Sequence, residues 1–103
     1  MDNERIKMLL AGVKEEPNDP FYPYGLALEY IVLDPQKAVE LLESLLQTHP
    51  DYLPTYYTAA KLFSISNSER AIAILEAGFE LAKAQQNAKA QREIQSALDE
   101  LMF

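Results

Sequence analysis

The sequence predicts an all-α protein made of stacked antiparallel helical hairpins, closed at the C-terminal end by a capping helix. Two observations support this prediction. The chain matches itself when shifted by 33 positions, and its apolar residues recur with the spacing of helices rather than the alternation of strands. Asn-Gly and Asp-Gly pairs, which favour tight β-hairpins, are absent. A length of 103 residues fits a single domain over residues 1–103.

The 33-residue repeat organises most of the chain. The shift superimposes prolines, tyrosines and small residues at once: Pro17 on Pro50, Tyr24 on Tyr57, Ala27 on Ala60, Ala38 on Ala71, and Leu42 on Leu75. Similar residues also coincide, including Tyr30 with Phe63 and Lys37 with Arg70. The register therefore predicts four segments: a half repeat over 2–16, full repeats over 17–49 and 50–82, and a capping helix over 83–103.

Local signals divide the first full repeat into two helices. Asp19 can cap a helix whose first position is Pro20, because proline needs no amide partner there. This helix is expected to run to about Leu33. The pair Asp34-Pro35 repeats the same start, and the second helix is expected to end near Thr48, before His49-Pro50.

The second full repeat follows the same scheme. A helix is expected from near Pro54 to about Ser66, and a longer one over roughly 68–86, capped by Ser66 or Asn67. Asn87 is suited to a turn. The last helix, over 88–102, carries one apolar stripe of Ile94, Ala97, Leu98, Leu101 and Met102.

This pattern resembles the tetratricopeptide repeat (TPR) family, over roughly residues 5–83. The features shared with the family are small residues at close helix crossings, an aromatic late in the first helix, a large apolar residue in the second, and a closing proline: Ala27, Ala38, Ala60, Ala71, Tyr30, Phe63, Leu42, Leu75, Pro17 and Pro50. The chain departs from the family at Pro23 and Tyr56, where tryptophan is usual, and at Lys83, where a proline usually closes the unit. The segment from Gln85 to Leu101 resembles the solvating helix that closes such arrays.

The resemblance implies a protein-binding scaffold whose groove is lined by the first helix of each repeat. In this sequence the groove row consists of Tyr24, Leu28 and Ile31, followed by Tyr57, Lys61 and Ser64. Packing between helices is the alternative role for this row, whereas Tyr30 and Phe63 are expected in the core. Some relatives hold the acidic tail of a chaperone with lysine, arginine and asparagine, but only Lys61 suits that role here.

Catalysis and metal binding find no support in the sequence. His49 is the single histidine and cysteine is absent, so neither a metal cluster nor a nucleophile with its base can be assembled. Gly12, Gly25 and Gly78 are isolated in helical patterns, which indicates close helix packing instead of a phosphate-binding loop. We therefore expect no enzyme activity, no cofactor and no metal.

The charge restricts the class of partner. A net charge of −7 and an isoelectric point of about 4.6 disfavour nucleic acid and anionic membranes. No signal peptide and no apolar run of the roughly 18 residues needed for a membrane span is visible. The expected partner is another protein with a basic or apolar surface, and the expected location is the cytoplasm.

Self-assembly stays open as a second function. The N-terminal segment carries more apolar residues than a single neighbouring helix requires: Ile6, Met8, Leu9, Leu10 and Val13. Because repeat arrays can stack end to end or pair by symmetry, this helix could join two copies into a homo-oligomer.

Overall fold

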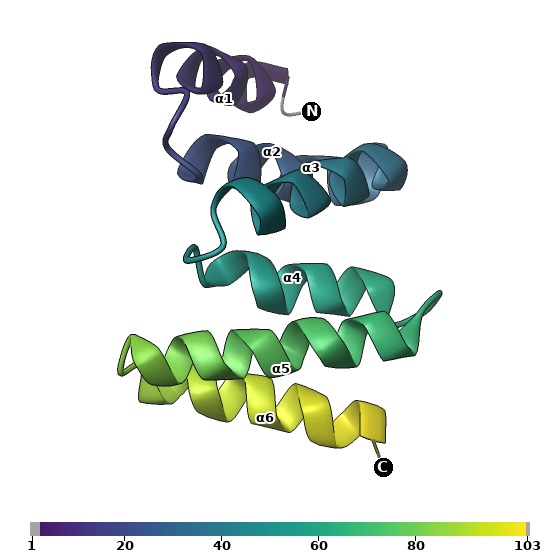
Figure 1. The fold of residues 1–103 in the computed structure, drawn as a ribbon. Coiled ribbons are helices and arrows are strands. Elements are labelled where there is room, and N and C mark those ends of the chain that lie inside the picture. The colour runs from purple at the N-terminus through teal and green to yellow at the C-terminus, as the bar shows by residue number, and fades with distance from the viewer. Residues whose placement is uncertain (1–2, 103) are drawn as a thin grey trace. The chain divides into compact units, whose positions relative to one another are not determined.

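The computed structural model describes residues 3–102, and within them six α-helices and no strand (Figure 1). The helices are α1 (Asn3–Glu15), α2 (Phe21–Leu33), α3 (Pro35–Thr48), α4 (Pro54–Phe63), α5 (Ser68–Ala84) and α6 (Ala88–Met102). The predicted all-α class is confirmed. Residues 1, 2 and 103 lie outside the described part; residue 2 belongs to the predicted half repeat and residue 103 to the predicted capping helix.

The helices form two compact units, Met1–Tyr52 with α1 to α3 and Leu53–Phe103 with α4 to α6. We refer to them as unit 1 and unit 2. The assignment of the whole chain to a single domain stays a prediction.

In unit 1, α1 and α2 pack antiparallel, as a series of contacts along both helices shows. Arg5 pairs with Glu29 at 2.8 Å. One turn further along α1, the Leu9 side chain lies where a Cβ on Gly25 would project, and Gly12 faces the ring of Tyr22. A side chain at Gly12 would overlap that ring, so this glycine permits close helix packing, as the sequence predicts.

The core of unit 1 combines leucines with small residues. Leu9, Leu26, Leu42 and Leu45 are buried, together with the fully buried Ala27 and Ala38. Burial of each leucine side chain contributes about 2 kcal/mol relative to exposure. Ala27 and Ala38, two of the alanines that the sequence shares with the family pattern, thus lie where close packing requires small residues.

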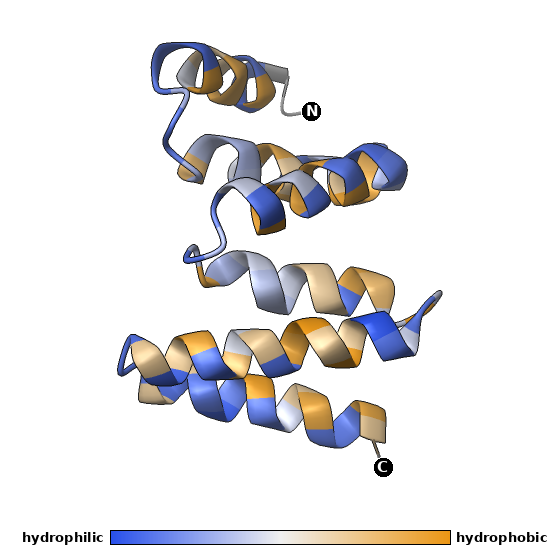
Figure 2. Cartoon of the chain, viewed as in Figure 1, coloured by the Kyte–Doolittle hydropathy of each residue, from blue (hydrophilic) through white to orange (hydrophobic). Residues whose placement is uncertain are grey.

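Unit 2 is organised around α5, which packs against both α4 and α6. Gly78 of α5 lies against Tyr56. A Cβ added at position 78 would lie 2.8 Å from the Cβ of Tyr56. Apolar and polar residues are interspersed along α6 (Figure 2), and Ile94 and Leu98 are its buried residues. Met102, which the sequence places on the apolar stripe of this helix, is exposed and does not share the burial of Ile94 and Leu98. At about 100° per residue it lies outside the arc from Ala97 to Leu98.

The caps repeat between units. Asp34 and Asn67 precede α3 and α5 with nearly identical backbone angles, φ −157° and ψ 82° against φ −152° and ψ 83°. The Oδ1 atom of each accepts a hydrogen bond from the amide three residues later, on Lys37 at 3.3 Å and on Arg70 at 3.1 Å. Helix α2 starts at Phe21, one residue later than expected, and Asp19 accepts from its amide at 2.9 Å.

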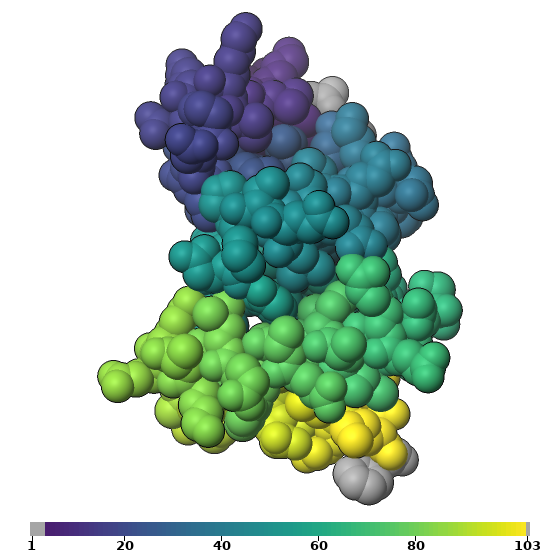
Figure 3. Space-filling model, in the orientation of Figure 1, coloured from purple at the N-terminus to yellow at the C-terminus, as the bar shows by residue number. Residues whose placement is uncertain are grey.

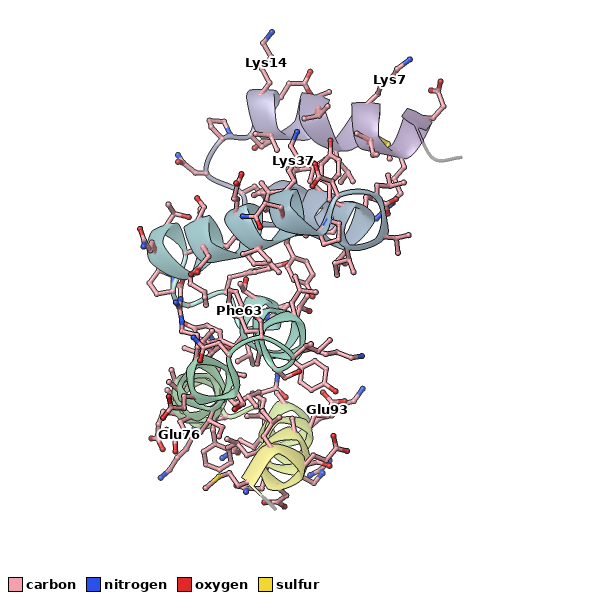
Figure 4. All side chains as sticks on the ribbon, turned by 90° about the vertical axis from the view of Figure 1, so that its right-hand side faces the viewer. Lys7, Lys14, Lys37, Phe63, Glu76 and Glu93 are labelled. Carbon is pink, nitrogen blue, oxygen red and sulfur yellow. The ribbon has the colours of Figure 1, made fainter. Side chains whose placement is uncertain are left out.

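Tyr30 and Phe63 are half-buried, which corrects the expectation that both belong to the core. The Nζ atom of Lys37 lies 4.9 Å from the centroid of the Tyr30 ring, and the guanidinium carbon of Arg70 lies 5.3 Å from that of Phe63. Figure 4 labels Lys37 and Phe63. A cation placed over an aromatic ring is attracted to it. In each hairpin, therefore, a long basic side chain of the second helix covers the aromatic ring of the first.

None of the helices in the described residues is long and apolar enough to cross a membrane.

Candidate interaction surface

The first half of the predicted groove row lies on α2, in unit 1. Leu28 is exposed, whereas Tyr24 and Ile31 are half-buried. The Tyr24 ring meets the Tyr52 ring edge to face, with centroids 5.6 Å apart and an angle of 70° between the ring planes. Leu28 is thus accessible while Tyr24 packs within the unit, and the groove role of the row stays a prediction.

Two neighbouring residues complete an exposed apolar row that the sequence analysis missed. Phe21 is 53% exposed and Val32 is 85% exposed, and both lie on the same side of α2 as Leu28. We call these three residues the α2 face. Their spacing of seven and then four residues is a helical signal that could have been found in the sequence.

The second half of the row lines a pocket of about 100 Å³ within unit 2. Its walls come from α4, α5 and α6 and comprise Tyr57, Ala60, Lys61, Ser64, Leu75, Ala97, Glu100 and Leu101. The structure thus brings together Tyr57, Lys61 and Ser64, all three predicted residues of this repeat. Tyr57 is 42% exposed, and the Lys61 Nζ lies 6.0 Å from the centroid of its ring.

The wall supplied by α6 was missed by the sequence analysis. Ala97 and Leu101 belong to the predicted apolar stripe of the capping helix, and Glu100 lies outside that stripe. Packing of α6 on α5, which Figure 3 shows as yellow against green, brings these residues to the α4 side chains. The pocket therefore offers an apolar floor together with an ammonium group, a carboxylate, a phenol and a hydroxyl.

Equivalent positions of the two repeats differ in chemistry. Leu28 and Ile31 of α2 correspond to Lys61 and Ser64, so the second repeat presents polar groups where the first is apolar. Val32 corresponds to Ile65, which is 93% exposed, so one apolar position is exposed in both repeats. The two surfaces thus differ in their chemistry.

His49 occupies a structural position at the end of α3. Its Nε2 lies 3.0 Å from the carbonyl oxygen of Asn18, which can only accept, so this nitrogen donates. Its Nδ1 lies 2.9 Å from Oγ1 of Thr48, and that hydroxyl is 2.9 Å from the carbonyl oxygen of Ser44. The imidazole therefore ties the loop between α1 and α2 to the last turn of α3, beside a surface cavity of about 350 Å³.

Tyr52, whose ring packs against that of Tyr24, is half-buried. Burial, reinforced by Tyr24 and Asp19, raises the pKa of Tyr52 above its ordinary value of 10.0. Among residues 3–102, no group of three or more His, Cys, Asp or Glu side chains is placed to hold a metal ion.

Comparison with known proteins defines the family. No family model matches the sequence, and no curated protein matches it. Two solved structures of tetratricopeptide repeat domain protein from Salinibacter ruber are similar to the chain. The solution NMR structure has 35% sequence identity and a TM-score of 0.78, covering 84% of this chain and 89% of the other. The crystal structure has 35% identity and a TM-score of 0.77, covering 82% and 96%. With this identity over most of both chains and a shared fold, the protein described here belongs to the tetratricopeptide repeat family.

Proposed function

We propose that this protein is a non-catalytic interaction module that holds a peptide or helix of a partner protein against the first helices of its repeats. The contact residues are Tyr24, Leu28 and Ile31 on α2, Tyr57 and Lys61 on α4, and Ser64 directly after α4. The observation that carries the proposal is the convergence of Tyr57, Lys61 and Ser64 on one pocket. Membership of a helical repeat family supports the same function.

The chemistry of these residues suits recognition. Tyrosine offers a large apolar area and a hydroxyl at the cost of little conformational entropy, and it is enriched among residues that dominate binding energy. The exposed ring of Tyr57 provides the area, and the ammonium group of Lys61 provides a charge that can orient a ligand. A pocket of about 100 Å³ has room for one aliphatic side chain rather than a metabolite.

Affinity purification from native cells, followed by mass spectrometry, tests the proposal. The bait is the whole chain, compared with its Tyr57→Ala and Leu28→Ala variants. We expect specific partners that both variants lose by tenfold or more, corresponding to about 1.4 kcal/mol or more. Met102→Ala removes an exposed apolar side chain elsewhere and is expected to retain the partners. Identical partners on all four baits would refute the proposal.

Self-assembly through α1 is a second candidate, favoured by one observation. Met8 and Leu10 are exposed on α1, while Leu9 between them is buried against α2. Light scattering at high micromolar concentration tests this candidate. A strict monomer would remove it, and a dimer that Leu10→Ser dissociates would support it.

A further inference from the structure

We infer that the α2 face binds an amphipathic α-helix with basic residues near its ends. This inference rests on the proposed function and adds the chemistry of the partner. Helix α2 is poor in charged residues. Its 13 residues include a single charged one, Glu29, which is paired with Arg5 at 2.8 Å. A helix that is apolar on all sides is normally buried on all sides. In α2, however, Phe21, Leu28 and Val32 remain exposed, which marks this face as a contact surface.

The α2 face offers no hydrogen-bonding partners to the backbone of a ligand. The side chains of Phe21, Leu28 and Val32 contain no hydrogen-bond donor or acceptor, and the central backbone groups of α2 are paired within the helix. An extended peptide laid on this face would bury amides without partners, and each such group costs about 1–3 kcal/mol. A helix pairs its own backbone groups, and it can present apolar side chains at the same seven- and four-residue spacing. The face therefore selects a helical ligand.

Unit 1 carries most of the negative charge of the protein. Residues 1–52 contain ten of the sixteen Asp and Glu residues of the chain, but only four of the nine Lys and Arg residues. Asp19 and Asp34 stand at opposite ends of α2, and both are exposed. Helix α2 between them spans about 20 Å. A helix of similar length with Lys or Arg near both ends would place each cation close to one of these carboxylates.

The four Lys and Arg residues of unit 1 are too few to balance its ten Asp and Glu residues. Arg5 is paired with Glu29, and Lys37 lies over the Tyr30 ring. Figure 4 shows Lys7 and Lys14 projecting from α1 on the side away from α2. A second copy of this chain would bring the same excess of carboxylates to the interface, so charge favours a basic partner over self-association.

Three labelled peptides of about 18 residues, which as helices of about 27 Å extend past both ends of α2, provide the test. The first has leucine along one helical face and lysine near both ends. The second has glutamate in place of lysine, and the third has two prolines in its middle. Fluorescence anisotropy with the whole protein is expected to show binding of the first peptide, with at least about tenfold weaker binding of the other two. Added salt is expected to narrow the difference between the lysine and glutamate peptides.

Variants of the protein assign the binding to the α2 face. Leu28→Ser and Val32→Ser are expected to weaken binding of the lysine peptide about tenfold, and circular dichroism checks that they remain folded. Met102→Ser, at an exposed apolar residue of unit 2, is the matched control and is expected to bind normally. Equal binding of all three peptides, or no effect of either serine variant, would overturn the inference. A dimer that Val32→Ser dissociates would replace it with self-association.

The test separates this inference from the proposed function. If the lysine peptide fails to bind while Tyr57→Ala still loses native partners, the basic helix is wrong and the interaction module stands. If neither measurement shows an effect of the variants, both proposals fail.

Discussion

Gln86 adopts a backbone conformation that favours glycine. Its φ of 57° is the single positive value at a non-glycine position in the described chain. It ends α5 through two hydrogen bonds, from the Gln86 amide to the Lys83 carbonyl at 3.0 Å and from the Asn87 amide to the Ala82 carbonyl at 2.8 Å. These are the bonds of a Schellman motif, which usually contains glycine at this position.

Replacing Gln86 by glycine is therefore expected to stabilise the protein. A side chain in the left-handed region costs about 1 kcal/mol, and glycine avoids this cost. Gln86→Gly should raise the free energy of unfolding by about 1 kcal/mol in urea titrations. Gln85→Gly, at an ordinary φ of −86°, is the control and should not stabilise. A gain in the control equal to that in Gln86→Gly would contradict this explanation.

Tyr52 makes the stability of unit 1 sensitive to alkaline pH. Burial raises its pKa in the folded state above the ordinary value of 10.0, so above that pH the unfolded chain releases the phenol proton more readily. The stabilisation is fully present below pH 10.0, and it is lost as the pH rises from there through the higher pKa of the folded state.

Tyr52→Phe removes this titration while keeping the ring against Tyr24. The variant should therefore gain stability relative to the wild type between about pH 9 and pH 11, although other groups change both proteins alike. Chemical unfolding at these two pH values measures the difference. An unchanged difference between variant and wild type would show that the phenol does not contribute.

At the scale of the elements, the second helix of each repeat starts with the same device. Asp34 and Asn67 share backbone angles and cap an amide three residues later. Replacing a cap of this kind by alanine typically costs about 1 kcal/mol. We expect Asp34→Ala and Asn67→Ala to lower the free energy of unfolding by similar amounts, measured in urea, and Ser68→Ala to have a much smaller effect. Unequal losses would show that the shared geometry does not carry shared energetics.

At the scale of the whole molecule, charge and apolar surface are distributed unevenly. Unit 1 holds most of the excess carboxylates and an exposed apolar helix, whereas unit 2 is close to neutral and holds the pocket of Tyr57 and Lys61. Equivalent residues of the two repeats therefore share a backbone role but not a chemical one, as Leu28 and Lys61 illustrate. Repeats that share a fold can in this way contribute different contacts to one partner.

The helices could be predicted from the sequence because their ends depend on local signals. Asp34-Pro35 starts α3, Asn67 starts α5 and Asn87 precedes α6, and each acts on an amide three residues away. Proline geometry and side-chain capping operate within a turn of helix, so they can be recognised without knowledge of the fold. The resemblance to the tetratricopeptide repeat family predicted the row that contains Tyr57 and Lys61, and the 33-residue register relates its members in the two repeats.

Only the tertiary structure decided which side chains remain exposed and which meet. Leu101 lines a pocket with Tyr57 because α6 packs on α5, and Met102 is exposed because that packing uses a neighbouring arc of the same helix. In unit 1, the packing of the helices likewise leaves Val32 exposed and places Lys37 over the Tyr30 ring. Apolar patterns show which residues favour burial, but burial depends on contacts between residues distant in sequence, which helical periodicity does not specify.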